Sequence, residues 1–388
     1  MRIAMVTETY PPEVNGVART VALMVNGLRA RGHEIELVRP RQGAQDRALE
    51  EDAFRERLRP GFRIPRYPQL RMGLPSRGAL LRAWSARAPD VVHIATEGPL
   101  GGSALAAARA LGIPVATDFH TNFDAYSGHY GAGWFAGLVR AHLRRFHNRA
   151  GCTMVPTDEL AVQLARHGFK RLRVVGRGVD SSVFSPAKRS TELRARWNAA
   201  EDTPVALCVS RFAPEKNFPL VLEAYRAMRA VRPDTRLVLV GDGPMAGELK
   251  RTSEGIVVAG RLVNGALSAH YASADIFLFP STTETFGNVT MEAMASGLAV
   301  VACDYAAARQ HIVHGRSGLL VPVDDRVGFI EKAAVLASDL QRARTLGRNA
   351  RAVAEPLGWD KVVGDFEAVL QETAGAQERV LRASHAAA

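Results

Sequence analysis

Two glutamates, Glu284 and Glu292, stand with seven residues between them in the segment 280–297. The segment follows an apolar run at 276–279 that is typical of a buried parallel strand, and it continues into a helix-forming run that ends at Gly297. Ligands of open α/β sheets bind at the carboxyl ends of strands, and helical side chains lean back toward the helix N-terminus. Both carboxylates can therefore face one crevice, beside helix-end amides that favour a phosphate. A solvated loop glutamate and an ordinary helix glutamate would also explain the pair.

Two cations, Arg211 and Lys216, lie five residues apart in the loop after another predicted strand, at 205–209. Fixed Arg and Lys groups can stabilise the charge that develops on a departing diphosphate. Gly241 and Gly243 follow the next predicted strand and let the backbone approach a ligand closely. Together these loops offer cations for a diphosphate and carboxylates for sugar hydroxyls. The sequence contains no Asp-x-Asp, so it does not predict a divalent metal held by carboxylates.

A histidine follows a predicted strand of the first half of the chain, at 114–118. His120 stands at the carboxyl end of that strand, among polar and aromatic residues, where it is well placed to contact a substrate. A lone histidine is more often a structural one. The residues that accompany it are Thr121, Asn122, Tyr126 and Tyr130.

The chain of 388 residues is too long for one comfortable core and suits two domains. Strands predicted at 2–7 and 34–38 flank a helix at 17–31, which is a β–α–β opening and predicts a parallel sheet. Residues 41–89 are rich in Arg and Pro and predict an irregular excursion with short helices. Glycine and proline cluster near 176–189, and a second α/β pattern starts afresh at 205–209, so the domain boundary is expected between about Asp180 and Arg189.

The composition, 47% hydrophobic and 23% charged, is that of a soluble globular protein. The first residues show no signal-peptide core, and no stretch approaches the roughly 20 apolar residues that span a bilayer. The three cysteines form no Cys-x-x-Cys and are expected to be buried thiols. These features predict a cytoplasmic protein.

The positive charge is concentrated in the first half of the chain. Residues 1–180 carry 26 Lys and Arg against 16 Asp and Glu, whereas residues 181–388 carry 24 against 23. This asymmetry indicates that the N-terminal half binds an anionic surface, either a membrane or a nucleic acid. A solvated Arg-rich face would also explain it. No nucleic-acid-binding module is recognised, and the aromatic residues do not interleave with Arg as a stacking platform requires.

The segment 134–149 predicts a basic amphipathic helix, which could lie in a membrane interface or bury its apolar side in an ordinary core. Its predicted apolar face consists of Phe135, Leu138, Val139, Leu143 and Phe146, and the basic residues beside or opposite that face are Arg140, Arg144, Arg145 and Arg149.

These motifs together resemble the retaining glycosyltransferases of family 4, the large glycogen-synthase-like group with the GT-B fold. The resemblance covers the chain nearly end to end. The N-terminal half, with its His-Thr-Asn-Phe at 120–123, resembles the subgroup that glycosylates lipids in bacteria, which includes GDP-mannose-dependent α-mannosyltransferases and sulfoquinovosyl-diacylglycerol synthases. The matching residues are Asn15-Gly16-Val17, Gly178-Val179-Asp180, Phe184, Arg211 with Lys216, Gly241-Asp242-Gly243-Pro244, Ala274-Asp275, the block from Glu284 to Glu292, and Ala-Met-Ala-Ser-Gly at 293–297.

The resemblance implies an α/β fold of the GT-B class, with two doubly wound Rossmann-like domains facing across a cleft. Residues 1–185 would form the acceptor-side domain, residues 186–357 would bind the nucleotide sugar, and a helix at 358–388 would return to the N-terminal domain.

The resemblance also implies roles for individual residues. Arg211 and Lys216 would hold the diphosphate and stabilise the leaving group, Glu284 would bind the sugar hydroxyls, and Glu292 would bind the ribose. His120 would lie by the sugar and the acceptor. The remaining donor-binding residues would be Gly16, Gly241, Arg261, Leu262, Phe286, Gly287, Asn288 and Val289, and the remaining acceptor-side residues Tyr10, Thr121, Asn122, Tyr126 and Tyr130.

The implied function is retaining transfer of a hexose, in the first place mannose from GDP-mannose, to a membrane glycolipid or lipid-like acceptor, at the inner face of the plasma membrane. The expected path is front-side attack, in which the donor phosphate takes the acceptor proton. We expect no cofactor, no metal and no nucleic-acid partner. A transferase that uses a UDP-sugar and acts on diacylglycerol or a polysaccharide precursor is the first alternative. A non-catalytic sugar-nucleotide-binding or membrane-associated protein is the second.

Overall fold

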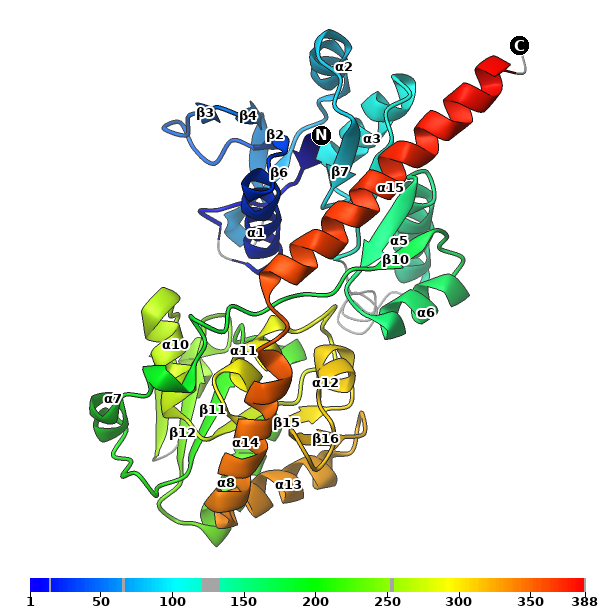
Figure 1. Cartoon of the computed structure of the whole chain (residues 1–388). Coiled ribbons are helices and arrows are strands. Elements are labelled where there is room, and N and C mark those ends of the chain that lie inside the picture. Colours follow the sequence, from blue (N-terminus) through cyan, green and yellow to red (C-terminus); the bar gives the residue numbers. More distant parts are fainter. Residues whose placement is uncertain (14, 65–66, 121–132, 252–254, 387–388) are drawn as a thin grey trace. The chain divides into compact units, whose positions relative to one another are not determined.

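The computed structural model describes residues 1–13, 15–64, 67–120, 133–251 and 255–386 of the chain. The chain divides into two compact units (Figure 1). Unit 1 comprises Met1–Gly176 together with Asp360–Ala388, and unit 2 comprises Arg177–Trp359. Each unit is built on its own sheet and is described by itself.

Unit 1 contains an eight-stranded sheet with the strand order β10-β9-β8-β7-β1-β2-β4-β3. All neighbours are parallel except β3, which pairs antiparallel with β4. The central strands β1, β7, β8 and β9 bury almost every residue, as strands covered by helices on both faces do. The strands are β1 (Arg2–Val6), β2 (Glu34–Pro40), β3 (Glu50–Glu51), β4 (Phe54–Arg59), β7 (Val91–Ile94), β8 (Val115–Asp118), β9 (Cys152–Val155) and β10 (Leu172–Val174).

The helices of unit 1 are α1 (Gly16–Ala30), α2 (Arg77–Ala86), α3 (Pro99–Ala110), α5 (Gly133–His147), α6 (Asp158–Arg166) and α15 (Trp359–Ala386). The last of them is anchored to the start of the chain. His33 lies 2.7 Å from Glu367 through Nε2 and Oε1, and its hydrogen bond lowers the pKa of the Glu367 carboxyl. Arg31 binds both Glu367 and Asp360. Gly27 leaves room for the Val363 side chain, because a Cβ there would come within 2.5 Å of it.

The expectation of an irregular segment with short helices at 41–89 is only partly right. A helix, α2, is present, but the segment also forms β3, β4 and a separate hairpin of β5 (Gly61–Ile64) and β6 (Tyr67–Gly73). Ion pairs explain why charged residues can build a strand here. Arg57 of β4 lies 3.0 Å from Glu36 of the neighbouring strand β2, and Arg55 pairs with Glu50 of β3. Cross-strand pairs of opposite charge stabilise sheets, and a hydrophobicity pattern does not reveal them.

Unit 2 contains a six-stranded parallel sheet with the order β13-β12-β11-β14-β15-β16. Its strands are β11 (Val205–Val209), β12 (Arg236–Val240), β13 (Ile256–Gly260), β14 (Ile276–Phe279), β15 (Ala299–Cys303) and β16 (Leu319–Val321). The helices are α7 (Thr191–Arg196), α8 (Phe218–Val231), α9 (Ala246–Leu249), α10 (Asn264–Ser273), α11 (Asn288–Ala295), α12 (Ala306–His311), α13 (Arg326–Ser338) and α14 (Leu340–Ala354), with short 3₁₀ turns at Pro186–Lys188 and Pro214–Lys216.

The two faces of this sheet bury two separate apolar clusters. Leu207 of β11 faces the cluster that contains Tyr271 of α10 and Met291 of α11. The next residue, Cys208, faces the cluster that contains Phe218 of α8 and Phe329 of α13. Successive strand residues thus pack into the apolar clusters on opposite faces of the sheet, as in doubly wound α/β folds. All three cysteines are buried and free, as predicted.

Candidate active site

The loops that carry the predicted donor-binding residues all leave the same edge of the sheet of unit 2. Because β11, β12, β13 and β14 are parallel neighbours, their carboxyl ends lie together. Arg211 and Lys216 follow β11, Gly241 follows β12, Arg261 follows β13, and Glu284 follows β14. This is the edge at which open α/β sheets bind ligands.

The structure brings Lys216 and Glu284 into direct contact, although 67 residues separate them in the sequence. Lys216 Nζ donates to Glu284 Oε1 at 2.5 Å, and Ser281 Oγ donates to the same oxygen at 2.9 Å. The side chains remain 15% and 20% exposed, respectively. A cation and a carboxylate therefore stand side by side at the sheet edge, where a ligand can reach both.

The other predicted cation, Arg211, is 48% exposed and pairs with Glu215, the residue before Lys216. Burial alone would raise the pKa of Glu215. Its own backbone amide and the Arg211 guanidinium outweigh that effect, so the pKa of this carboxyl is lowered. Glu215 stays charged and orients Arg211 within the loop. The carbonyl of Glu215 also accepts a hydrogen bond from Thr283 Oγ1 at 3.3 Å, which ties the β11 loop to the β14 loop.

The glycines after β12 support the Arg211 loop. A Cβ at Gly241 would stand 1.8 Å from the Ser210 carbonyl oxygen, and one at Gly243 would stand 2.5 Å from the Phe212 carbonyl oxygen. Phe212 N donates to the Asp242 carbonyl at 2.9 Å. The two glycines thus allow close contact with the backbone of the neighbouring Arg211 loop, whereas the sequence analysis expected close contact with a ligand.

We therefore expect Gly241→Ala to displace the Arg211 loop. Gly241 has φ +147°, which disfavours alanine, and the added Cβ would collide with backbone that cannot rotate away. The expected result is a loss of about 2–4 kcal/mol in unfolding free energy, together with weakened binding of nucleotide. Thermal unfolding with and without nucleotide measures both effects. Gly247→Ala is the matched control, because a Cβ there would meet only the end of the Arg251 side chain, at 3.7 Å. Wild-type stability of Gly241→Ala would contradict this role.

The start of α11 presents backbone amides beside Glu284. Gly287 caps the helix in the left-handed conformation, with φ +90° and ψ +62°. Phe286 is buried, and its carbonyl accepts from Ala307 N at 2.9 Å, which fixes the turn. The first amides of a helix have no intrahelical acceptor, so those of Asn288 and Val289 are suited to an anion.

Glu292 lies deeper than Glu284, one turn into α11, and is 7% exposed. Its Oε2 accepts a hydrogen bond of 3.0 Å from the hydroxyl of Tyr271 on α10. Two further residues predicted near the base of the nucleotide follow the edge strand β13. Of these, Arg261 is exposed and Leu262 is half-buried.

The carboxyl edge of the sheet of unit 1 carries the predicted N-terminal residues. Gly16 is the first residue of α1, directly after Asn15, whose Oδ1 caps the helix by accepting from Ala18 N at 2.8 Å. Tyr10 is half-buried in the loop after β1, and burial raises the pKa of its hydroxyl.

His120 follows β8 and is nearly buried, with 9% of its side chain exposed. Its Nε2 lies 3.2 Å from Asp118 Oδ2, which is within ion-pair distance, but the geometry does not form a hydrogen bond between them. The neighbouring predicted residues Thr121, Asn122, Tyr126 and Tyr130 lie outside the described residues.

Comparison with known proteins identifies the family. Residues 14–183 match the family model described as Glycosyltransferase Family 4, and residues 203–339 match the one described as Glycosyl transferases group 1. A GDP-mannose-dependent alpha-mannosyltransferase of Mycolicibacterium smegmatis is 36% identical over 379 residues, which cover 95% of this chain and 98% of the relative. The chain belongs to glycosyltransferase family 4. As a member it is a retaining glycosyltransferase, as predicted from the sequence.

Other family 4 relatives and solved structures agree with this assignment. A sulfoquinovosyl transferase of Arabidopsis thaliana is 29% identical over 92% of this chain and 71% of its own length. Sucrose-phosphate synthase from Thermosynechococcus elongatus superimposes with a TM-score of 0.75 at 19% identity, covering 97% of this chain and 99% of that one. The predicted fold class, GT-B with two Rossmann-like domains, is thereby confirmed.

In unit 1 of this family 4 enzyme, the sequence analysis missed a buried polar chain behind His120. His147 Nε2 lies 3.3 Å from Glu97 Oε1, and its Nδ1 lies 2.9 Å from Thr117 Oγ1. Burial would raise the pKa of Glu97, but His147 and, to a smaller extent, His120 outweigh it and lower the pKa. The position of Glu97 after strand β7 was a usable signal, whereas nothing in the sequence pairs it with His147, which lies 50 residues further along.

The structure also assigns Glu8 and Glu13 to loop architecture. Glu8 accepts from the amides of Gly73 and Leu100 at 2.5 and 2.8 Å, and burial raises its pKa. Glu13 accepts from Arg71 N at 3.0 Å and from Thr9 Oγ1 at 2.5 Å. Among the described residues, no group of three or more His, Cys, Asp and Glu is arranged to hold a metal ion.

Proposed function

We propose that this family 4 glycosyltransferase transfers mannose from GDP-mannose, with retention, to a lipid or glycolipid acceptor. The observation that carries the proposal is the contact of Lys216 with Glu284, at the sheet edge where a nucleotide sugar would bind. The donor follows from the relative of M. smegmatis, whose name specifies GDP-mannose. The lipid acceptor follows from relatives such as the alpha-monoglucosyldiacylglycerol synthase of Acholeplasma laidlawii, 27% identical over 92% of this chain.

In the proposed mechanism, different residues at the edge of the unit 2 sheet bind different parts of the donor. Arg211 and Lys216 neutralise the diphosphate as it leaves, and the amides of Asn288 and Val289 add further donors. Lys216 gives up its hydrogen bond to Glu284 and binds a phosphate oxygen of the donor instead. The Glu284 carboxylate is then free to accept hydrogen bonds from the hydroxyl groups of the sugar. The acceptor attacks from the face of the leaving group, and its proton passes to the departing phosphate. Because two fixed cations supply the positive charge, we expect no requirement for a divalent metal.

Unequal burial supports the proposed roles of the two glutamates. Glu284 is 20% exposed in its loop, where it can follow the sugar as the reaction proceeds. Glu292 is 7% exposed and held by the hydroxyl of Tyr271, so its geometry is fixed, as suits the unreactive ribose hydroxyls. We assign His120, with Asp118 beside it, to the sugar and the acceptor.

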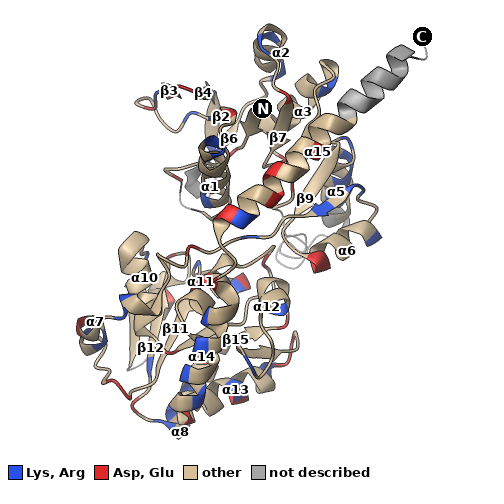
Figure 2. Cartoon of the chain, in the orientation of Figure 1, with Lys and Arg blue, Asp and Glu red and all other residues tan. Residues whose placement is uncertain are grey.

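The acceptor proposal includes a membrane surface. On α5, Leu138 is 58% exposed, whereas Leu143 and Phe146 of the predicted apolar face are buried. Arg144 and Arg145 are exposed on the same helix, and Figure 2 shows basic residues along it. An exposed leucine among arginines suits insertion between anionic headgroups. In the described part of the chain, no helix is long and apolar enough to cross a bilayer. On the basis of Leu138 and the arginines near it, we propose peripheral binding at the inner face of the plasma membrane.

A panel of donors tests the nucleotide and the sugar. Thermal unfolding is measured with GDP-mannose, UDP-glucose, UDP-glucuronate and UDP-sulfoquinovose, since a ligand at 100 times its Kd stabilises the folded state by about 2.7 kcal/mol. We expect the largest increase in melting temperature with GDP-mannose. A larger increase with one of the UDP-sugars would favour the alternative donor. No shift with any of the four would exclude GDP-mannose and these three UDP-sugars as the donor.

A further inference from the structure

A cavity of about 340 Å³ lies at the edge of the unit 2 sheet opposite to the one that carries Lys216 and Glu284. Its lining includes Asp275, which immediately precedes β14, and Gly297, which lies two residues before β15. Because the strands are parallel, the amino ends of β14 and β15 are remote from their carboxyl ends. The cavity is therefore separate from the proposed donor site.

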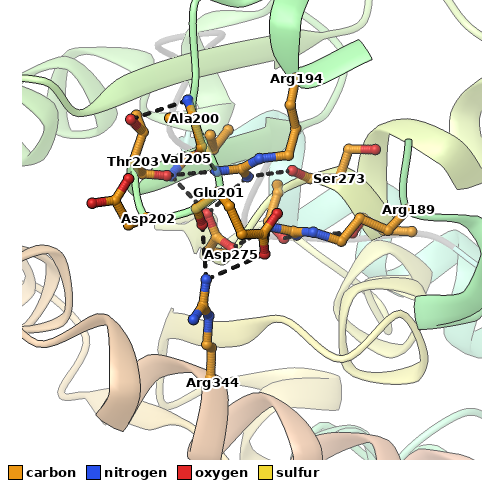
Figure 3. A network of polar contacts seen from close by, with 12 residues as sticks. Arg189, Arg194, Ala200, Glu201, Asp202, Thr203, Val205, Ser273, Asp275 and Arg344 are labelled. Atoms are coloured by element: carbon orange, nitrogen blue, oxygen red, sulfur yellow. Dashed lines mark hydrogen bonds and ion pairs between the residues drawn. The ribbon is translucent and has the colours of Figure 1, made fainter. Parts of the chain in front are cut away.

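Four of the eleven residues that line this cavity are arginines, and Figure 3 shows two of them, Arg189 and Arg344, on either side of Glu201. Arg189 Nη2 lies 3.3 Å from Glu201 Oε1 and 3.2 Å from Asp275 Oδ1. Arg344 Nη2 lies 3.3 Å from the same oxygen of Glu201. Behind them, the buried Arg194 binds Asp275 Oδ2 at 3.1 Å. Each of these two carboxylates is thus shared between two guanidinium groups.

Two more arginines of α14 complete the lining. Arg351 is fixed to protein, because its Nη1 donates to the Ala295 carbonyl at 2.7 Å and its Nη2 to Glu355 at 2.7 Å. Arg348 is different. Among the described residues its one partner is the neutral hydroxyl of Thr345, at 3.0 Å. Five guanidinium groups therefore meet three carboxylates here, which leaves two positive charges without a counter-charge within the cluster.

A buried hydroxyl adds a second, independent observation. Ser296 lines the cavity and is 3% exposed, and within the described structure its Oγ has no hydrogen-bond partner. Buried polar atoms nearly always have a partner, and a bound ion is one of the explanations for an exception. The uncommitted N–H groups of Arg344 and Arg348 can donate to an anionic oxygen in the cavity.

We propose that this cavity binds a phosphate monoester. A dianion matches the two excess charges, and Arg presents its N–H groups in the fork that phosphate oxygens accept. The cavity is near the lower end of the range for small-molecule sites, about 300–1,000 Å³, which admits a phosphate with a sugar-sized substituent. Arg344 and Arg348 are the ligand-binding residues, and Arg189 and Arg351 shape the wall.

Protection from chemical modification tests the site residue by residue. The protein is treated with phenylglyoxal, which modifies accessible arginines, in phosphate and in chloride of equal ionic strength, and the modified peptides are identified by mass spectrometry. We expect phosphate to reduce modification of Arg344 and Arg348 several-fold and to leave Arg342 unchanged. Arg342 is exposed on the same helix and does not line the cavity. The Arg211 peptide reports on the donor site separately. Equal modification of Arg344, Arg348 and Arg342 in the two salts would overturn the proposal.

Equilibrium dialysis identifies the source of the phosphate. The probes are inorganic phosphate, glucose 6-phosphate and vesicles containing phosphatidic acid, each tested with wild type, with the Arg344→Gln/Arg348→Gln double variant and with Arg342→Gln. We expect at least one probe to bind wild type and Arg342→Gln equally and the double variant at least ten-fold more weakly. The probe that does so indicates free phosphate, a soluble phosphate ester or a lipid headgroup. Unaltered binding to the double variant, or no binding of any probe to wild type, would overturn the proposal.

Discussion

Replacing Lys216 by alanine should lower kcat by about 10²–10³-fold while the protein stays folded. Removal of one preorganised group that stabilises developing charge has about this cost, and Lys216 is the cation in direct contact with Glu284, at 2.5 Å. The substitution leaves Glu284 with the hydroxyl of Ser281 and 20% exposure to water, so its charge remains solvated. The effect should therefore appear in turnover and not in the melting temperature.

The matched control for this variant is Lys250→Ala. Lys250 is an exposed lysine of the same unit, at the end of α9, and should retain wild-type rates. Release of nucleoside diphosphate is measured for both variants alongside thermal unfolding. Full activity of Lys216→Ala would show that the diphosphate assignment is wrong. Loss of activity together with a large fall in melting temperature would instead assign Lys216 to the architecture of the loop.

Replacing Asp275 by alanine should destabilise unit 2 by about 3–5 kcal/mol, the usual cost of removing one partner of a buried ion pair. Asp275 is 7% exposed and accepts from Val205 N at 3.0 Å, in addition to Arg194 and Arg189 (Figure 3). The variant would leave the guanidinium of Arg194, which is 2% exposed, without its counter-charge. A unit of this size should then melt roughly 10 °C lower.

Asp202→Ala provides the comparison for Asp275→Ala. Its side chain is 82% exposed and lies 3.7 Å from Arg232, so its loss should cost no more than about 0.5 kcal/mol. Thermal unfolding followed by circular dichroism measures both variants. A fall in melting temperature of only 1–2 °C for Asp275→Ala would mean that water or a shifted Arg194 replaces the lost charge, and that the network is not a structural clamp.

The sequence was sufficient to predict that the loops of Arg211 and Glu284 leave one edge of a parallel sheet, because each strand and the loop after it can be recognised from a short local pattern. Arg211 and Glu284 each follow a short apolar strand, and strands of that kind must present their carboxyl ends at one edge. This rule places Lys216 and Glu284 at the same edge, and the structure adds that their side chains are in direct contact. The depth of Glu292 could not be predicted in the same way, since it depends on Tyr271, a residue of another helix.

Polar pairs between distant elements were beyond sequence reasoning. The strand β4 was missed because its arginines are neutralised by Glu36 and Glu50, which lie on other strands. Leu138 was expected on the same face as Leu143, yet it is exposed, because a helical wheel does not show where the packed stripe ends. In each case the outcome depends on contacts with other elements, which the local sequence pattern does not contain.

The measurement that tests the central claim most directly is the transfer reaction itself. Lipid vesicles containing anionic phospholipid and diacylglycerol or glycolipid acceptors are incubated with GDP-mannose and the wild-type enzyme, and the lipid product is analysed by mass spectrometry and by NMR of its anomeric proton. We predict a lipid that carries one additional hexose in α linkage, formed about 10²–10³-fold more slowly by Lys216→Ala. A β-linked product, or transfer from a UDP-sugar with none from GDP-mannose, would contradict the account.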